Sequence, residues 1–174
     1  MPERAIDPQA IHDELERARA DLHRMVVAAT PASLRRASDG TRWTNEQLLF
    51  HMLFGTLIVR TLIPLVRFLA RLPGPVSSGF ARLLDAASTP FHIVNYLGSC
   101  GGALVFNHDR MGRRLDRTIA ALRRRLATES PASLQRSACF PPRWDPCFRD
   151  VMTLAEVYHY ATQHVDAHAR QLTL

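Results

Sequence analysis

The segment 48–70 restricts the fold most strongly, because its sequence, LLFHMLFGTLIVRTLIPLVRFLA, is apolar on nearly every side. Thr44 and Gln47 form a capping box just before it, which predicts that a helix begins there. A helix without a polar face must be covered on several sides. A membrane span needs about 20 mostly apolar residues with few charges, whereas this run is interrupted by His51, Arg60, Pro64 and Arg67. We therefore predict a buried bundle helix and no membrane partner.

Three further long helices are indicated by one-sided apolar stripes. The first begins with Asp7 as N-cap and Pro8 at its first position, and its stripe is Ile11, Leu15, Ala18, Leu22, Met25 and Ala29. The third long helix along the chain follows a long crossover and carries Leu115, Ile119, Leu122 and Leu126 on one face. The last opens with a capping box of Thr153 and Glu156 and continues towards the C-terminus. No alternating pattern predicts a strand, so we expect an all-α four-helix bundle in a single domain, 1–174.

Residues 72–103 form a long crossover between the second and third of these helices. The stretch LPGPVSSG is typical of a loop, FARLLDAA favours a short helix, and GSCGG is not expected to continue one. A connection of this length is expected to carry structure of its own or to cover a site.

A weak internal repeat joins the two halves of the chain. PASLRRAS at 31–38 recurs as PASLQRSA at 131–138, and each copy is followed by an Arg-Trp pair. Each copy also connects a long helix to a helix that carries histidines. Two interpretations remain open: two similar turns, or two related helical hairpins that face each other.

Composition narrows the choice of partners and compartment. All 22 basic residues are arginine and the net charge is +6, but the arginines are dispersed and do not alternate with aromatic residues. This favours a solvated surface, with no nucleic-acid partner. The odd count of cysteines without a C-x-x-C pair argues against disulfides, and the polar start MPERAIDPQ lacks the apolar run of a signal peptide. We expect a cytoplasmic protein. An alternative explanation for the apolar second helix is that it forms the interface of a homodimer.

The histidines of the second and last helices are the strongest functional signal. His164 and His168 are one turn apart, so both rings lie on one face, the buried one. His51 lies two turns into the apolar helix. A buried polar group without a partner costs about 1–3 kcal/mol, and one shared metal ion removes that cost for all three imidazoles. The alternative is three separate core histidines bonded to backbone carbonyls or to Tyr158 or Tyr160.

These residues resemble a known family. Trp43-Thr44 before a helix with an inward His51, and a last helix with His164-Val-Asp-Ala-His168-Ala-Arg-Gln171, are similar to the DinB/YfiT-like metal-binding bundles. The resemblance implies a four-helix bundle with a long crossover between helices two and three. It also implies that the three histidines are the ligands of zinc, nickel or a similar ion. Characterised members of the family include thiol S-transferases and a thiol-dependent isomerase that use mycothiol or bacillithiol.

Three histidine ligands leave a position open for water or substrate, as in catalytic zinc sites. Asp166 lies on the wrong face to be a fourth ligand, whereas Gln171, one turn beyond His168, is placed to orient it. The favoured function is a metal-dependent S-transferase that joins a low-molecular-weight thiol to a small electrophilic substrate. Hydrolysis is the alternative, and His108 is the best candidate for its general base, although an ordinary core or surface role explains this histidine better.

A further alternative is a non-catalytic ligand-binding or stress-related bundle with a structural metal. The cysteines offer no independent reaction. Cys100, in GSCGG, has no histidine or aspartate placed by sequence to activate it. Cys139 and Cys147 flank FPPRWDP, which we interpret as a rigid lid over the last helix, and they are expected to be packed thiols.

Overall fold

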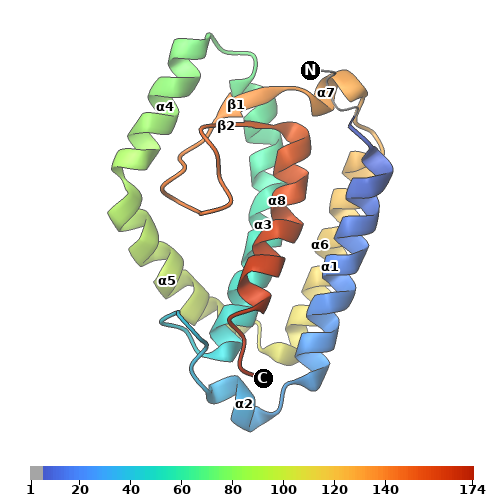
Figure 1. Ribbon diagram of the computed structural model, residues 1–174, viewed down its shortest axis with the longest axis vertical. Coiled ribbons are helices and arrows are strands. Elements are labelled where there is room, and N and C mark those ends of the chain that lie inside the picture. The colour runs from blue at the N-terminus through green and yellow to red at the C-terminus, as the bar shows by residue number, and fades with distance from the viewer. Residues whose placement is uncertain (1–5) are drawn as a thin grey trace.

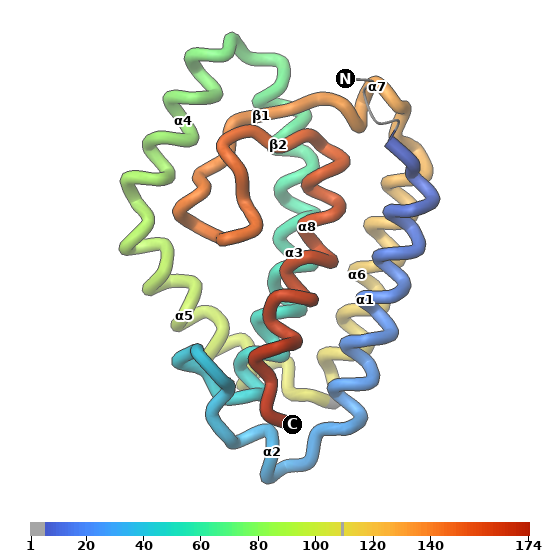
Figure 2. The backbone as a smooth tube through the Cα atoms, in the orientation of Figure 1, coloured from blue at the N-terminus to red at the C-terminus, as the bar shows by residue number. Residues whose placement is uncertain are grey.

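The computed structural model describes residues 6–174 and confirms the all-α fold. The bundle is formed by α1 (Pro8–Ala28), α3 (Asn45–Leu69), α6 (His108–Leu126) and α8 (Leu154–Ala169). Figures 1 and 2 show α3 beside α8, and α1 beside α6, with α4 and α5 on the far side of α3 from α1. The first five residues, which are part of the stretch used to exclude a signal peptide, lie outside the described residues.

Three of the four long bundle helices, α1, α3 and α8, begin where the sequence predicts. The Asp7 carboxylate accepts a hydrogen bond from the backbone N–H of Gln9 (2.9 Å) at the start of α1. Reciprocal capping boxes begin α3 and α8, at Thr44 and at Thr153. Each box satisfies backbone N–H groups that have no partner within the helix. The predicted stripe of α1 is buried at Ile11, Leu15, Ala18 and Leu22.

The central position of α3 explains its apolar composition. Among the described residues, α3 is the one helix long and apolar enough to cross a bilayer, but 56% of its most apolar window is buried within the protein. It packs against α8, α6 and α5. The helix runs through Pro64 without ending, although this proline has no N–H to donate to the preceding turn. Three neighbouring helices therefore cover the apolar sides of α3.

The crossover is more helical than the sequence indicates. The loop predicted at LPGPVSSG is largely helix α4 (Gly74–Ala86), and α5 (Ser88–Val105) continues through GSCGG, so both of these predictions were wrong. A Cβ atom built on Gly102 would lie 2.1 Å from a carbon of the Phe50 ring. Glycine therefore lets α5 approach α3 closely, and this packing compensates for the low helix propensity of glycine.

The prediction that the chain has no strand was also wrong. Strands β1 (Ser137–Cys139) and β2 (Val151–Thr153) form a short antiparallel pair, with Ala138 opposite Met152. Three-residue strands are too short to show an alternating pattern in the sequence. The pair connects the chain before the loop 140–150 to the start of α8.

The internal repeat corresponds to two hairpins of the same construction. The short helices α2 (Pro31–Arg35) and α7 (Pro131–Leu134) occupy equivalent places, before α3 and before α8. The N–H of Asn45 donates to the carbonyl of Arg36 (2.9 Å), and the N–H of Leu154 donates to the carbonyl of Arg136 (2.7 Å). The bridge between Ala37 and Thr44 corresponds to the pair Ser137–Thr153. Because the agreement extends from the short helices to the backbone pairing and to the helices that follow, it favours two related helical hairpins over two similar turns alone.

The close approach at Gly102 gives a test of the crossover packing. We expect Gly102→Ala to lower the free energy of unfolding by about 1–3 kcal/mol, because the new methyl group overpacks the contact with Phe50. Gly101→Ala is the control, because a Cβ there meets nothing within 4 Å. It should instead raise the free energy by about 0.5–1 kcal/mol. Urea denaturation measures the free energy of unfolding of both variants. Equal changes in the two variants would show that α5 does not pack on α3 in this way.

Candidate metal centre

The three histidines identified in the sequence meet at one point between α3 and α8. His51 comes from α3, and His164 and His168 come from α8. The ring centroids are 4.8 Å apart for His51 and His164, 4.8 Å for His51 and His168, and 4.6 Å for the α8 pair. One ring nitrogen from each residue lies within 4.8 Å of those of the other two. This histidine cluster is placed to hold a single ion.

Space for the cluster comes from a glycine on α3. A Cβ atom at Gly55 would lie 2.2 Å from Cδ2 of His164 and 2.7 Å from its Nε2. The His164 ring therefore rests directly on the α3 backbone, where any other residue would displace it. Trp43 covers His51 from the other side, with ring centroids 4.3 Å apart and an angle of 27° between the planes.

The surroundings of His164 determine which ring nitrogen carries the proton. Its Nδ1 lies 3.2 Å from Oδ2 of Asp145, a carboxylate that also accepts hydrogen bonds from the Tyr160 hydroxyl (2.9 Å) and the backbone N–H of Cys147 (2.8 Å). A carboxylate only accepts hydrogen bonds, so Nδ1 of His164 must donate. In the neutral ring Nε2 then has a free lone pair, and this buried atom has no hydrogen-bond partner.

The hydrogen bonds of the other two rings also place the hydrogen on Nδ1. Nδ1 of His51 lies 3.1 Å from the Ser99 hydroxyl oxygen, and that hydroxyl donates its one proton to the carbonyl of Asn95 (2.8 Å). The hydroxyl therefore accepts from His51. Nδ1 of His168 lies 2.7 Å from Oε1 of Gln171, an amide oxygen that accepts. In all three residues Nδ1 carries the hydrogen and Nε2 keeps its lone pair.

Burial favours the neutral forms of His51 and His168. Burial, together with the neighbouring His164 and His168, lowers the pKa of His51 to about 2. Burial and His164 also lower the pKa of His168. Burial alone would raise the pKa of Asp145, but the hydrogen bond from His164 and the other donors hold it below its usual value. Neutral imidazoles supported by an ionised carboxylate are the arrangement typical of metal-binding histidines.

A divalent metal ion fits this set of donors. Lone pairs of neutral imidazoles cannot hydrogen-bond to one another, and the buried Nε2 of His164 has no donor facing it. An unsatisfied buried acceptor costs about 1–3 kcal/mol. One cation coordinated by the three Nε2 atoms would remove this cost, and imidazole ligands suit zinc and nickel.

Two hollows border the cluster. A narrow one of about 50 Å³ reaches His51 and His164, and its wall is mainly apolar, including Phe54, Ile58, Leu62, Phe91 and Phe148. A wider one of about 340 Å³ reaches His168 and is lined by polar and aromatic groups, including Arg42, Trp43, His92, Asn95 and Tyr96. Asn95 lines both. The cluster is thus bordered by a narrow hollow with mainly apolar walls and by a wider one that also offers polar side chains.

The loop 140–150 supplies the carboxylate and is held firmly by the crossover. The indole of Trp144 stacks on Phe91 with centroids 3.9 Å apart, and its Nε1–H donates to the carbonyl of Leu84 (2.7 Å). The backbone N–H of Arg143 donates to Asp85 (3.0 Å). Figure 1 shows this loop between α4, α5 and the two central helices. The crossover therefore helps to cover the site, as its length indicated.

Other residues considered in the sequence lie elsewhere. His108 begins α6, where its Nδ1 is 3.8 Å from Oε1 of Glu46, and it lines neither hollow. Asp166 pairs with Arg17 (2.9 Å) on the outer surface. Burial and the neighbouring Asp145 raise the pKa of Cys147 to about 11, so its thiol stays protonated near neutral pH.

Sequence reasoning missed Asp145 and Ser99. Asp145 stands within FPPRWDP, the segment predicted to cover the last helix. That position is the signal from which a contact between this carboxylate and His164 could have been predicted. Ser99 stands in GSCGG, where the predicted end of the helix concealed that it faces His51. Gln171, by contrast, bonds the ring that its spacing indicated.

The fold and the cluster together define a class: a four-helix bundle with three histidines from its second and last long helices. The model of the DinB superfamily matches residues 14–172, which is nearly the whole chain. The chain therefore belongs to the DinB superfamily. No curated protein and no solved structure matches it.

The hydrogen bond between Asp145 and His164 gives a test of the centre. We expect Asp145→Asn to weaken zinc binding about 10- to 100-fold, because the amide does not supply the negative charge that raises the basicity of His164. Isothermal titration calorimetry with zinc measures the change. Asp150→Asn is the matched control, since this exposed aspartate ends the same loop and should leave affinity unchanged. Equal zinc affinities for the two variants would contradict the assigned role of Asp145.

Proposed function

We propose that this protein binds one divalent metal ion, zinc or nickel, through Nε2 of His51, His164 and His168. We further propose that it is a metal-dependent S-transferase, which joins a low-molecular-weight thiol such as mycothiol to a small electrophilic substrate. The observation that carries the proposal is the convergence of three imidazoles beside two hollows of different size and lining.

The number of ligands supports a reactive rather than a structural ion. Structural zinc sites are closed by four side chains, whereas catalytic sites have three and leave one position open. Among the residues whose side chains the structure describes, no fourth histidine, cysteine or carboxylate joins the cluster. Asp145 is directed at Nδ1 of His164. When bound, the metal would lower the pKa of a coordinating thiol, so that the thiolate forms near neutral pH.

The two hollows suit the two reactants. We assign the wider one to the thiol, because such thiols are polar and Arg42, Asn95 and Tyr96 offer hydrogen-bonding groups there. The Arg42 guanidinium lies 5.1 Å from the Tyr96 ring centroid and forms no ion pair with the described residues. It is therefore available to a ligand. We assign the narrow apolar hollow to the reacting group of the electrophile.

The protein residues then have simple tasks. Gln171, Ser99 and Asp145 hold the three rings in place through their Nδ1–H groups. The thiol loses its proton to solvent through the wider hollow. Its sulfur forms a bond to the electrophilic carbon, and the leaving group departs with its electron pair. The phenyl walls of the narrow hollow exclude water from that carbon.

The linings of the hollows favour thiol transfer over hydrolysis. A hydrolase would use a general base beside its water. Among the described residues, Asp145 is the one carboxylate that lines either hollow, and it already accepts from His164, Tyr160 and Cys147. The His92 ring, at the wider hollow, bonds the carbonyl of Arg143 through Nε2 (3.0 Å). A thiol needs no such base, since a bound metal ion is sufficient to promote loss of its proton.

The proposal predicts formation of a thioether that depends on both metal and thiol. The zinc-loaded protein is incubated with 1-chloro-2,4-dinitrobenzene and, in turn, mycothiol, bacillithiol, glutathione or cysteine, and the product is measured by mass spectrometry. We expect one thiol to react at least about 100-fold faster than without protein. His164→Ala should abolish this acceleration, because it removes a metal ligand.

His159→Ala is the matched control, because His159 lies on the same helix but pairs with Glu14 (2.7 Å) outside the cluster. It should retain activity. A melting temperature that falls on chelation, with no thioether from any thiol, would instead indicate a structural metal in a ligand-binding bundle. Metal-dependent ester cleavage without thiol would indicate a hydrolase. Either result would contradict the proposed transferase.

A further inference from the structure

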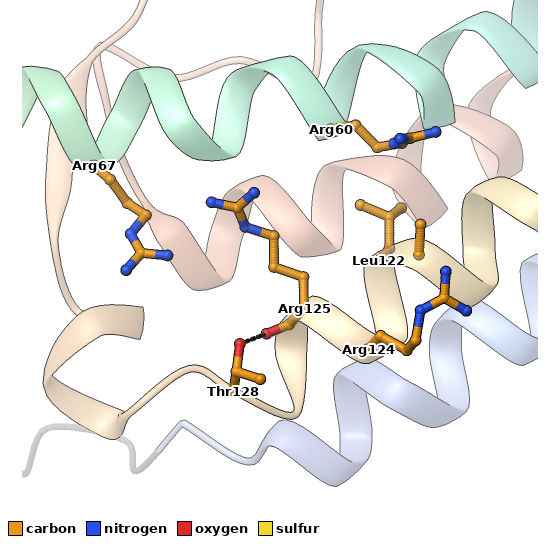
Figure 3. A pocket seen from close by; sticks show the side chains of 7 residues that line it. Arg60, Arg67, Leu122, Arg124, Arg125 and Thr128 are labelled. Atoms are coloured by element: carbon orange, nitrogen blue, oxygen red, sulfur yellow. Dashed lines mark hydrogen bonds between the residues drawn. The ribbon is translucent and has the colours of Figure 1, made fainter.

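A separate hollow of about 510 Å³ lies between α3 and α6, and its distinguishing feature is four arginines. Figure 3 shows Arg60 and Arg67 from α3, and Arg124 and Arg125 from α6, around this space. We call it the arginine hollow. In the part of the chain that the structure describes, no aromatic side chain lines it, and its other lining residues are Ala121, Leu122 and Thr128.

The arginine hollow lies away from the histidine cluster. Arg60 follows His51 by nine residues on α3, which places it about 180° around the helix. Arg67 comes seven residues later, so it shares the face of Arg60 two turns further along. No residue lines both the arginine hollow and either hollow at the cluster. Any ligand here is therefore distinct from the reactants proposed above.

Among the described side chains, a single carboxylate offsets the charge of these four arginines. Glu129 is buried, with 1% of its side chain exposed, and lies 3.3 Å from Arg67 Nη1 and 3.9 Å from Arg125 Nε. The Ser133 hydroxyl donates to it (2.6 Å). With one negative charge against four guanidinium groups, an excess of about three positive charges remains around the hollow.

Much of the hydrogen-bonding capacity of these arginines is not used by other protein groups. In the described part of the chain, the side chains of Arg60 and Arg124 form no ion pair or hydrogen bond, and the buried Nε of Arg125 has no hydrogen-bond partner. Like charges gathered around one space repel each other, and an anion would relieve that repulsion. Guanidinium groups bind phosphate oxygens through paired N–H donors, which gives strong and directional contacts.

We propose that the arginine hollow binds a small polyanion of the phosphate class, such as a diphosphate or a phosphate monoester. The excess of positive charge matches a multiply charged oxyanion. The absence of aromatic rings among the lining residues provides no platform on which nucleobases could stack, which favours a small ligand over a nucleic-acid strand.

The test is pyrophosphate binding to metal-free protein by isothermal titration calorimetry. We expect one pyrophosphate per chain and a higher melting temperature in its presence. The double variant Arg60→Gln/Arg124→Gln should lose affinity about tenfold or more, while its zinc uptake stays normal. The control, Arg82→Gln/Arg113→Gln, removes the same charge from two exposed arginines outside the hollow and should bind pyrophosphate within about twofold of the unmodified protein.

The other results would overturn the proposal. Absence of pyrophosphate binding would do so, and equal weakening in both double variants would show only an effect of net charge. Tighter binding of a single-stranded oligonucleotide through the same arginines would indicate a nucleic-acid site instead. If pyrophosphate binds, a sugar phosphate and phosphatidic acid vesicles distinguish a soluble phosphate from a lipid headgroup. Because the protein is metal-free, the outcome does not depend on the proposed transferase.

Discussion

The hydrogen bonds made by the three imidazole Nδ1–H groups are the constraint on which the site depends. Each bond ends at a different acceptor: a carboxylate at Asp145, a hydroxyl at Ser99 and an amide at Gln171. Together they turn three lone pairs towards one buried point, where the protein offers no donor to Nε2 of His164. Such an arrangement is unfavourable by itself and becomes favourable with a cation. The chemistry we propose follows from that requirement.

The internal repeat explains how the chain builds this point. Gly55 and His164 both lie eleven residues after their capping threonines, Thr44 and Thr153. The two hairpins thus present equivalent positions to each other, and glycine in the first makes room for histidine in the second. His51 corresponds in the same way to Tyr160, whose hydroxyl supports Asp145. A symmetric scaffold therefore carries an asymmetric set of ligands.

Sequence patterns predicted what depends on local structure and missed what depends on distant contacts. Helix starts at Asp7, Thr44 and Thr153 and the shared face of the α8 histidines follow from spacing within a few residues. The helix through GSCGG depends on Gly102 meeting Phe50, which no local pattern reveals. The place of Asp145 depends on Trp144 stacking against Phe91, more than fifty residues earlier in the chain. The arginine hollow likewise joins two helices that are distant in sequence.

X-ray absorption spectroscopy of zinc-loaded protein reports the atoms bound to the ion and so tests whether the three histidines share it. We expect one ion per chain, coordinated by three imidazole nitrogens at about 2.0–2.1 Å and by one water oxygen in the open position. His51→Ala should remove one imidazole contribution. A spectrum with fewer than three imidazoles, or with the same number in that variant, would contradict a shared site between α3 and α8.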